Sequence, residues 1–344
     1  MALKAPCDDR PPMPEFRQDP ITGRWVIIAP GRAARPWHIG AGQPRATAEP
    51  CPFCAGNEAM TPPEVWAQRQ PHTKANAPGW RLRIVPNKYP ALISSGEPTD
   101  ENESSYRSMN ALGMHEVIIE SPDHVTQMSA LSAIQLVDIL RAYRARLRAL
   151  GDDPRWRYLM IYKNEGERAG ATLEHIHSQL TALPIVPREA MDEWNGARNH
   201  FAATARCIYC EIARRAIASG ERLVAENERF VALCPFAPRF GYETWLLPKS
   251  HAAAFVESSE GDLMAFGQIL GDLLQKFVRL FASPAFNYVI HSAPPDEVKS
   301  PHYHWHMEIL PQLTRAAGFE WGSGVHMNSI APEDAARSLR NAPV

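Results

Sequence analysis

Two histidines and a glutamine alternate along one short segment of the chain. His175, His177 and Gln179 occur in the stretch ATLEHIHSQL, residues 171–180. Because successive side chains of an extended strand point to opposite faces, all three would share one face. Such a row suits a metal site, a nucleophile with its helpers, or a hydrogen-bonded polar core. The rest of the sequence decides among these three possibilities.

Four of the six cysteines form two C-x-x-C pairs. Cys51 and Cys54 occur in CPFC, Cys207 and Cys210 occur in CIYC, and each pair is followed by spaced histidines. In a long chain whose first residues have no apolar core, such pairs favour a metal site over a disulfide framework. A thioredoxin-like redox site is not indicated, because neither pair has the strand-to-helix setting of that motif.

The residue types of the first half predict a structural zinc site. Cys51, Cys54, His124 and one histidine of the HIH segment would make a tetrahedral Cys₂His₂ set. Four protein ligands leave no open position, so this ion would not activate water. It would instead hold the first histidine in place, which leaves His177 free as the candidate nucleophile.

The residues around His177 indicate a phosphate group as the electrophile. The segment NEGERAGATLEH, residues 164–175, contains two glycines that let a backbone approach a ligand closely. Neutral hydrogen-bond donors and forked guanidinium groups would hold the phosphate oxygens. The glycines are Gly166 and Gly170, the neutral donors are Asn164, Thr172 and Gln179, and the arginines are Arg24, Arg32 and Arg35.

The order of patterns in the first half returns in the second half. Apolar residues at helical spacing predict one long helix ending near Gly151 and another within residues 261–282. His124 and His175 are 51 residues apart, and so are His251 and His302. Aligned without a gap, this repeat places His175, His177 and Gln179 opposite His302, His304 and His306.

The repeat predicts an α+β fold made of two tandem units. Each unit would be a mostly antiparallel sheet with one long packed helix. We expect a catalytic N-terminal domain over residues 1–190, with the first C-x-x-C metal site. A C-terminal repeat over residues 191–344 would carry the second. The polar segments 1–15 and 94–105 are expected to be loops or disordered.

Several motifs together resemble the galactose-1-phosphate uridylyltransferase family of the histidine-triad superfamily. They include RQDPITGRWVIIAPGRAARPW, CPFC, NKYPAL, ESPDH, NEGERAGATLEHIHSQ and HYHWHMEILPQL. The resemblance implies a double displacement in which His177 attacks the α-phosphorus of a nucleotide, and it implies Cys51, Cys54, His124 and His175 as the first zinc ligands. Implied nucleotide contacts are Arg32, Arg35, Asn87, Asn164, Gly170, Thr172 and Gln179.

The chain departs from the uridylyltransferase pattern in two places. The signature reads His-Ile-His-Ser-Gln rather than His-Pro-His-Gly-Gln, and the usual C-terminal sugar-phosphate segment is not visible. Residues 317–328, AGFEWGSGVHMN, look instead like the adenylyl-transferring relatives, such as ADP-glucose phosphorylase and adenylylsulfate:phosphate adenylyltransferase. This likeness implies further nucleotide contacts at Phe319, Ser323 and Gly324.

The fourth ligand of the second metal site is open to three interpretations. Repeat symmetry adds His302 to Cys207, Cys210 and His251, whereas the adenylyl-transferring relatives imply His304, directly before Trp305. The uridylyltransferase pattern implies a different metal set, and thiolates attract zinc more strongly than a carboxylate does. We choose His304, with His302 as the rival. The uridylyltransferase set would be Glu193, His291, His304 and His306.

These patterns predict a nucleotidylyltransferase with two structural zinc ions per chain. It would move a nucleoside monophosphate, with adenylyl slightly favoured, from an ADP-sugar or adenylylsulfate to phosphate or a sugar 1-phosphate. The alternative is UDP-glucose–hexose-1-phosphate uridylyl transfer in galactose metabolism, and a nucleotide hydrolase is less favoured. Net charge is −2, so neither nucleic-acid nor membrane binding is indicated. We expect a cytoplasmic protein, and the family resemblance implies a homodimer.

Overall fold

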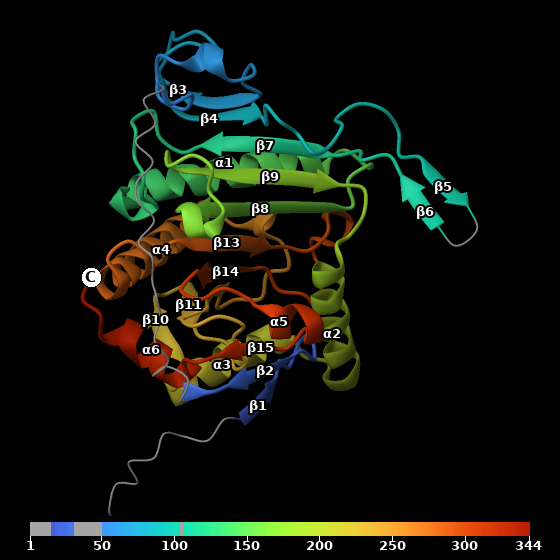
Figure 1. Cartoon of the computed structure of the whole chain (residues 1–344), viewed down its shortest axis with the longest axis vertical. Helices are drawn as coiled ribbons and strands as arrows, with labels where there is room; N and C mark the ends of the chain where they lie inside the picture. Colours follow the sequence, from blue (N-terminus) through green and yellow to red (C-terminus); the bar gives the residue numbers. More distant parts are fainter. Residues whose placement is uncertain (1–14, 31–49, 104–105) are drawn as a thin grey trace, which may run out of the picture.

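A single ten-stranded sheet runs through both halves of the chain (Figure 1). The computed structural model describes residues 15–30, 50–103 and 106–344. Every neighbouring pair of strands in this sheet is antiparallel. The strands are β3 (Trp66–Arg69), β4 (Trp80–Pro86), β7 (Met114–Ile119), β8 (Tyr158–Glu165), β9 (His177–Leu183), β10 (Leu223–Glu226), β11 (Phe230–Leu233), β12 (Thr244–Pro248), β13 (Phe286–His291) and β14 (His306–Pro311).

The strand order confirms the repeat. From the centre outward, the first half reads β8, β9, β7, β4, β3, and the second half reads β13, β14, β12, β11, β10. Each half thus places its strands in the same chain order, and β8 pairs with β13 to join them. The expected α+β class is confirmed, with one continuous sheet in place of two separate ones. The expected boundary at residue 190 falls inside helix α2 (Arg188–Thr204).

Two long helices, α1 (Ala133–Gly151) and α4 (Glu260–Phe281), pack side by side against one face of the sheet. A serine begins each helix with a capping box, Ser132 for α1 and Ser259 for α4. The helices can approach closely because Gly267 has no side chain: a Cβ there would lie 2.6 Å from Val137 Cγ2. Their buried apolar residues form the largest core with the inward face of the sheet.

Shorter elements cover the other face of the sheet. In the second half, α2 and α3 (Ile208–Ser219) pack over Val231, Leu233, Trp245 and Leu247. The chain ends with α6 (Pro332–Asn341) against β10 and α4. A second sheet contains β1 (Glu15–Gln18), β2 (Trp25–Ile28) and β15 (His326–Asn328), with α5 (Gly318–Ser323) beside it. The described residues include 3-10 helices at Glu58–Met60, Met128–Ala130, Glu167–Ala169, Phe255–Glu257 and Pro295–Glu297.

Two local expectations differ from the structure. The polar segment 94–105, expected to be a loop, contributes β5 (Asp100–Glu103), which pairs with β6 (Tyr106–Met109) as a hairpin. The sequence of this segment lacks the alternation of apolar and polar residues by which a strand is recognised. The HIH segment is also only partly a strand, since β9 begins at His177 and His175 precedes it.

Within the described ranges, none of the helices combines the length and apolar character needed to span a lipid bilayer.

Candidate functional site

The candidate catalytic side chains lie on the face of the sheet opposite α1 and α4. On β9, Leu180 belongs to the core under the helices, whereas His177 and Gln179 alternate with it. In register, Tyr162 of β8 and Val117 of β7 lie beside Gln179. Strand pairing therefore gathers residues from several segments on one surface.

The His177 ring is held in one tautomer. Its Nδ1 lies 2.8 Å from the main-chain oxygen of His175, so Nδ1 carries the proton and Nε2 keeps a lone pair. The side chain is 8% exposed, and the Phe53 ring lies 5.2 Å away between centroids. Burial lowers the pKa of His177 from its ordinary value, and Lys163 lowers the pKa further. The ring is thus a neutral imidazole near pH 7, as a nucleophile requires.

Cys51, Cys54, His124 and His175 converge into one cluster, with all four possible ligand atoms within 4.8 Å of one another. The Nδ1 atom of His175 lies 3.6 Å from each sulfur, and His124 Nδ1 lies 3.4 Å from Cys54 Sγ. A tetrahedral ion with bonds of about 2.3 Å to sulfur and about 2.0 Å to nitrogen would separate such atoms by about 3.5 Å. The four side chains therefore have the spacing of a closed tetrahedral metal site.

Hydrogen bonds outside the cluster orient these groups. His175 Nε2 donates to the Ser121 oxygen at 2.9 Å, which leaves Nδ1 unprotonated and directed at the cysteines. Asn57 Nδ2 donates to the Cys51 oxygen at 2.8 Å and holds the C-x-x-C turn. The main-chain oxygen of His175 also accepts the hydrogen bond from His177 Nδ1. One residue therefore belongs to the cysteine cluster and contacts the nucleophile.

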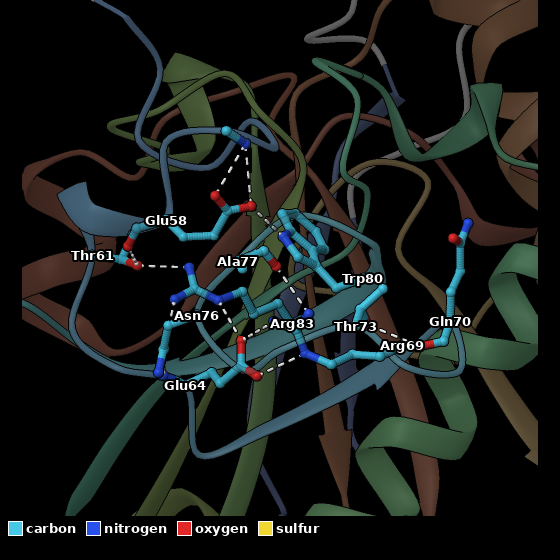
Figure 2. A network of polar contacts seen from close by, with 11 residues as sticks. Glu58, Thr61, Glu64, Arg69, Gln70, Thr73, Asn76, Ala77, Trp80 and Arg83 are labelled. Atoms are coloured by element: carbon cyan, nitrogen blue, oxygen red, sulfur yellow. Dashed lines mark hydrogen bonds and ion pairs between the residues drawn. The ribbon is translucent and has the colours of Figure 1, made fainter.

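A polar network anchors the cysteine turn to β3 and β4 (Figure 2). Glu58 accepts from the Gly56 amide at 3.1 Å and from Trp80 Nε1 at 2.7 Å. Burial would raise the pKa of Glu58, but these hydrogen bonds outweigh it and the pKa falls. Next to it, the Glu64 carboxylate bridges Arg69 and Arg83. The turn is thus fixed to the edge of the sheet.

The second half contains a matching cluster of Cys207, Cys210, His251 and His304. Cys210 Sγ lies 3.5 Å from His251 Nδ1 and 3.4 Å from His304 Nδ1, while Cys207 Sγ lies 4.0 Å from His304 Nδ1. His251 Nε2 donates to the Ser300 main-chain oxygen at 3.1 Å, and His304 Nε2 donates to the Pro248 main-chain oxygen at 3.0 Å. The spacing again fits a tetrahedral ion.

The ungapped alignment of the two repeats is wrong by two residues. His304 and His306, not His302 and His304, occupy the places of His175 and His177, and His306 Nδ1 lies 3.1 Å from the His304 oxygen. The loop before this strand is longer, because 53 residues separate His251 from His304. His302 instead contacts Ser300 Oγ at 2.8 Å and packs its ring on Trp194.

The third group with metal-ligating chemistry is a buried ion cluster. It contains Glu193, His291, His306 and Glu308, so it differs from the uridylyltransferase pattern, in which His304 would be a ligand. Burial alone would lower the pKa of His291, but Glu193 at 3.1 Å raises it to about 10. Arg239 pairs with Glu308 at 2.5 Å. Arg239 also lies 3.7 Å from a third buried carboxylate, that of Glu243.

His306, the counterpart of His177 in the second half, is buried against two neighbouring rings. His306 is 1% exposed, the Tyr209 ring lies 4.9 Å from it, and the His291 ring stacks on it at 4.9 Å. Glu308 occupies the position that corresponds to Gln179 and is bound in the ion cluster. The second half thus has a buried, ion-paired carboxylate where the first half has the neutral Gln179 amide.

His115 and Tyr162, which no pattern in the sequence singled out, orient Gln179. The Gln179 amide oxygen accepts from Tyr162 Oη at 3.0 Å and lies 2.8 Å from His115 Nε2. Both lone pairs are then used, so the amide NH₂ group points away from these partners and is free to donate. The same Nε2 lies 3.1 Å from Asn87 Nδ2, which cannot donate to it while Nε2 carries the proton given to Gln179. The position of His115 at the start of the apolar run HEVIIE was the available signal.

The glycine-containing loop follows β8 and lies next to the start of β9. Gly170 has φ 87° and no described atom within 4 Å of a Cβ built there, so its surface is open. Asn287 of β13 donates to Asn164 Oδ1 at 2.7 Å and to the Ala169 oxygen at 2.8 Å. The second half thus holds the loop, while Thr172 stays exposed.

Three further expected contacts, all in the described part of the chain, lie away from His177. Phe319, Ser323 and Gly324 lie in and after α5, which Figure 1 places beside β15 and away from β9. Ser323 Oγ donates to the Phe319 oxygen, and Phe319 is 45% exposed. Arg32 and Arg35 lie outside the described residues.

Comparison with known families gives matches over both halves. The family described as galactose-1-phosphate uridyl transferase, N-terminal domain, matches residues 5–187. A domain of unknown function matches residues 140–341.

The relatives cover nearly the whole chain. ADP-glucose phosphorylase of Arabidopsis thaliana is 36% identical over 95% of this chain and 92% of its own length. Galactose-1-phosphate uridylyltransferase of Thermotoga maritima is 30% identical over 96% of this chain and 99% of its own.

Solved structures share the fold. The crystal structure of an ADP-glucose phosphorylase from Arabidopsis thaliana with bound ADP-glucose matches with a TM-score of 0.81 and 35% identity, over 96% of this chain and 100% of that one. A uridylyltransferase structure matches with a TM-score of 0.74 and 26% identity, over 96% and 98%. The expected resemblance is confirmed: the chain belongs to the galactose-1-phosphate uridylyltransferase family and is a nucleotidyltransferase.

Proposed function

We propose that this enzyme transfers an adenylyl group from ADP-glucose to phosphate through a covalent intermediate on His177. The observation that carries the choice of substrate is the 36% identity to ADP-glucose phosphorylase over 95% of the chain. The fixed tautomer of His177, with Nδ1 bonded and Nε2 bare, supports the covalent route.

In the first step, His177 Nε2 attacks the α-phosphorus of ADP-glucose. A P–N bond forms, the bond from the α-phosphorus to the bridging oxygen breaks, and glucose 1-phosphate leaves. In the second step, an oxygen of inorganic phosphate attacks the same phosphorus and releases ADP and free His177. The Gln179 NH₂ group, turned outward by His115 and Tyr162, donates to the phosphoryl oxygens.

The nucleotide would lie along the surface formed by Asn87, Gln179 and the loop 164–172. We infer that Phe319, Ser323 and Gly324 contact it from a second copy of the chain, because α5 lies away from β9 within one chain (Figure 1). Arg32 and Arg35 are proposed as further contacts. The enzyme would then be a homodimer, which light scattering can measure.

The two Cys₂His₂ clusters are proposed to hold one structural zinc ion each. Two soft thiolates and two imidazoles in tetrahedral spacing are the donor set that zinc favours. A bound ion supplies a rigid anchor for His175, and the protein groups alone carry out the transfer. Contact with Cys210, and then with His251 and His304, lowers the pKa of the Cys207 thiol, which favours the thiolate that a metal needs.

The second candidate function is uridylyl transfer between UDP-glucose and a hexose 1-phosphate. The 30% identity to the Thermotoga maritima uridylyltransferase over 96% of the chain favours it over nucleotide hydrolysis. Hydrolysis would use the same intermediate with water as the acceptor.

We predict that His177→Asn abolishes transfer, with a loss of at least about a thousandfold in kcat, because the nucleophile is gone. Wild-type enzyme given ADP-glucose without phosphate should release one glucose 1-phosphate per site and carry AMP on the peptide containing His177. Mass spectrometry and product analysis measure both.

ADP-glucose, UDP-glucose and adenylylsulfate are offered separately, each with phosphate or galactose 1-phosphate. Preferred consumption of UDP-glucose with galactose 1-phosphate would support the second candidate. Continuous release of free AMP would indicate a hydrolase. An adduct on another residue would contradict the role of His177.

We predict two zinc ions per wild-type chain and one ion in His304→Ala, whereas His302→Ala should retain two. Metal-binding energy is folding energy, so His304→Ala should also melt at a lower temperature. Elemental analysis and thermal melting provide the measurement, and loss of zinc from His302→Ala alone would reverse the assignment.

We predict that His115→Ala lowers kcat roughly tenfold, because the Gln179 amide loses one of the two hydrogen bonds that orient it. If His115 acts through Gln179, the double variant His115→Ala/Gln179→Ala should be no slower than Gln179→Ala alone. Steady-state kinetics of the three variants measure this coupling. Rate losses that multiply would show that His115 acts independently.

A further inference from the structure

A buried ion pair lies beneath the nucleophile, on the side of the sheet that faces α1 and α4. Lys163 Nζ lies 2.5 Å from Glu120 Oε2, and the two side chains are 1% and 0% exposed. Removing two charges from water costs several kcal/mol each in effective terms, and apolar residues of similar size are often at least as stable. Stability alone therefore gives little reason for this pair.

The pair is joined to the main chain of His177. Lys163 Nζ donates a second hydrogen bond to the His177 oxygen at 3.1 Å. The register of β8 and β9 brings this contact about, because Lys163 lies opposite Ser178 and its side chain points away from the catalytic face. The nucleophile is thus held by its ring through Nδ1 and by its carbonyl through Lys163.

The hydroxyl of Tyr143, in α1, connects the Lys163–Glu120 ion pair to Ser178 and Tyr288. Its hydroxyl lies 2.9 Å from Glu120 Oε1, 2.7 Å from Ser178 Oγ and 2.5 Å from Tyr288 Oη. A phenol has one proton and two lone pairs, so Tyr143 donates to Glu120 and accepts from Ser178 and Tyr288. Burial raises the pKa of both tyrosines well above the ordinary value, which keeps these protons in place.

This network connects the two halves of the chain. Tyr143 lies in the helix of the first half, whereas Tyr288 lies in β13 of the second half, next to β8 at the centre of the sheet. Apart from Ser178, the residues of this network are distant from His177 in the sequence. All the residues of the network are buried. The second half therefore reaches the peptide of the nucleophile from the side of the sheet that α1 and α4 cover.

We propose that Lys163, Glu120, Tyr143 and Tyr288 are positioning residues that lock the His177–Ser178 peptide and so aim Nε2 at the α-phosphorus. The inference rests on the proposed function of His177. Misplacement of a reacting group by about 1 Å costs about a hundredfold in rate, so a relaxed peptide should slow the chemical step more than substrate binding.

The test is the single-turnover rate of AMP attachment to His177 from ADP-glucose. The main variant is Lys163→Met/Glu120→Gln, which removes both charges together and retains an acceptor for Tyr143. Replacing both partners avoids leaving Glu120 or Lys163 as an unpaired buried charge, and Glu165, 3.8 Å from Lys163 Nζ, keeps its hydrogen bond from the Met128 amide. We expect a melting temperature near that of wild type, unchanged zinc content, and attachment slowed about ten- to hundredfold with little change in the KM for ADP-glucose.

A matched control comes from the neighbouring strand and the same helix. Arg146 of α1 and Glu116 of β7 form a part-buried pair, with Nε 2.7 Å from Oε2, and within the described residues neither side chain bonds to the His177 main chain. Arg146→Met/Glu116→Gln should keep the wild-type attachment rate. An equal slowing in this control would show that any buried pair matters, and would overturn the inference.

A second variant, Tyr288→Phe, removes the hydroxyl group that the second half of the chain contributes to this network. We expect attachment slowed about threefold to tenfold, the effect of one hydrogen bond. A wild-type rate in Lys163→Met/Glu120→Gln overturns the inference and leaves the proposed function intact. If that variant does not fold, a wild-type rate in Tyr288→Phe overturns it. Absence of any AMP attachment in wild type would refute the proposed function, and this inference with it.

Discussion

The hydrogen bond from His177 Nδ1 to the His175 oxygen is the constraint on which the rest of the site depends. It assigns the ring proton, directs Nε2 outward and requires the main chain at His175 to stay fixed. The cysteine cluster holds the His175 side chain, and the network of Glu58, Trp80 and Glu64 holds the cysteine turn. Each outer layer thus limits the motion of the layer inside it, which is how a preorganised site reduces the cost of reaching the transition state.

The two halves of the chain share one architecture but differ in the side chains that it carries. Both halves have the same strand order, the same type of cluster and the same imidazole-to-carbonyl bond. In the second half, the Tyr209 ring packs on His306, and Glu308, paired with Arg239, stands where the first half has Gln179. Its remaining contribution is to brace the first half: Asn287 holds the loop after β8, and Tyr288 reaches the network under β9.

Much of the site could be predicted from the sequence, because its groups are marked by local patterns. The two C-x-x-C pairs, the His-x-His segment and the glycines of residues 164–175 are each contiguous, and the helix ending at Gly151 follows from spacing and a stop residue. His115, Tyr162 and Lys163 could not be found in this way, since their roles arise only when β7, β8 and β9 pair in a particular register. The gap in the repeat was missed because equal spacing to His302 was coincidental, and the longer loop is visible only when His304 is seen beside Cys210. Phe319 and its neighbours lie in and after α5, away from β9 (Figure 1), a separation that no local pattern reveals.

The most direct test of the central constraint is the identity of the ring nitrogen that carries the nucleotide. Enzyme loaded with ADP-glucose in the absence of phosphate is digested, and the His177 peptide is examined by phosphorus and nitrogen NMR for the position of the P–N bond. We expect a single isomer, bonded through Nε2, because Nδ1 is committed to the His175 oxygen. A phosphoramidate at Nδ1, or a mixture of the two isomers, would contradict this constraint.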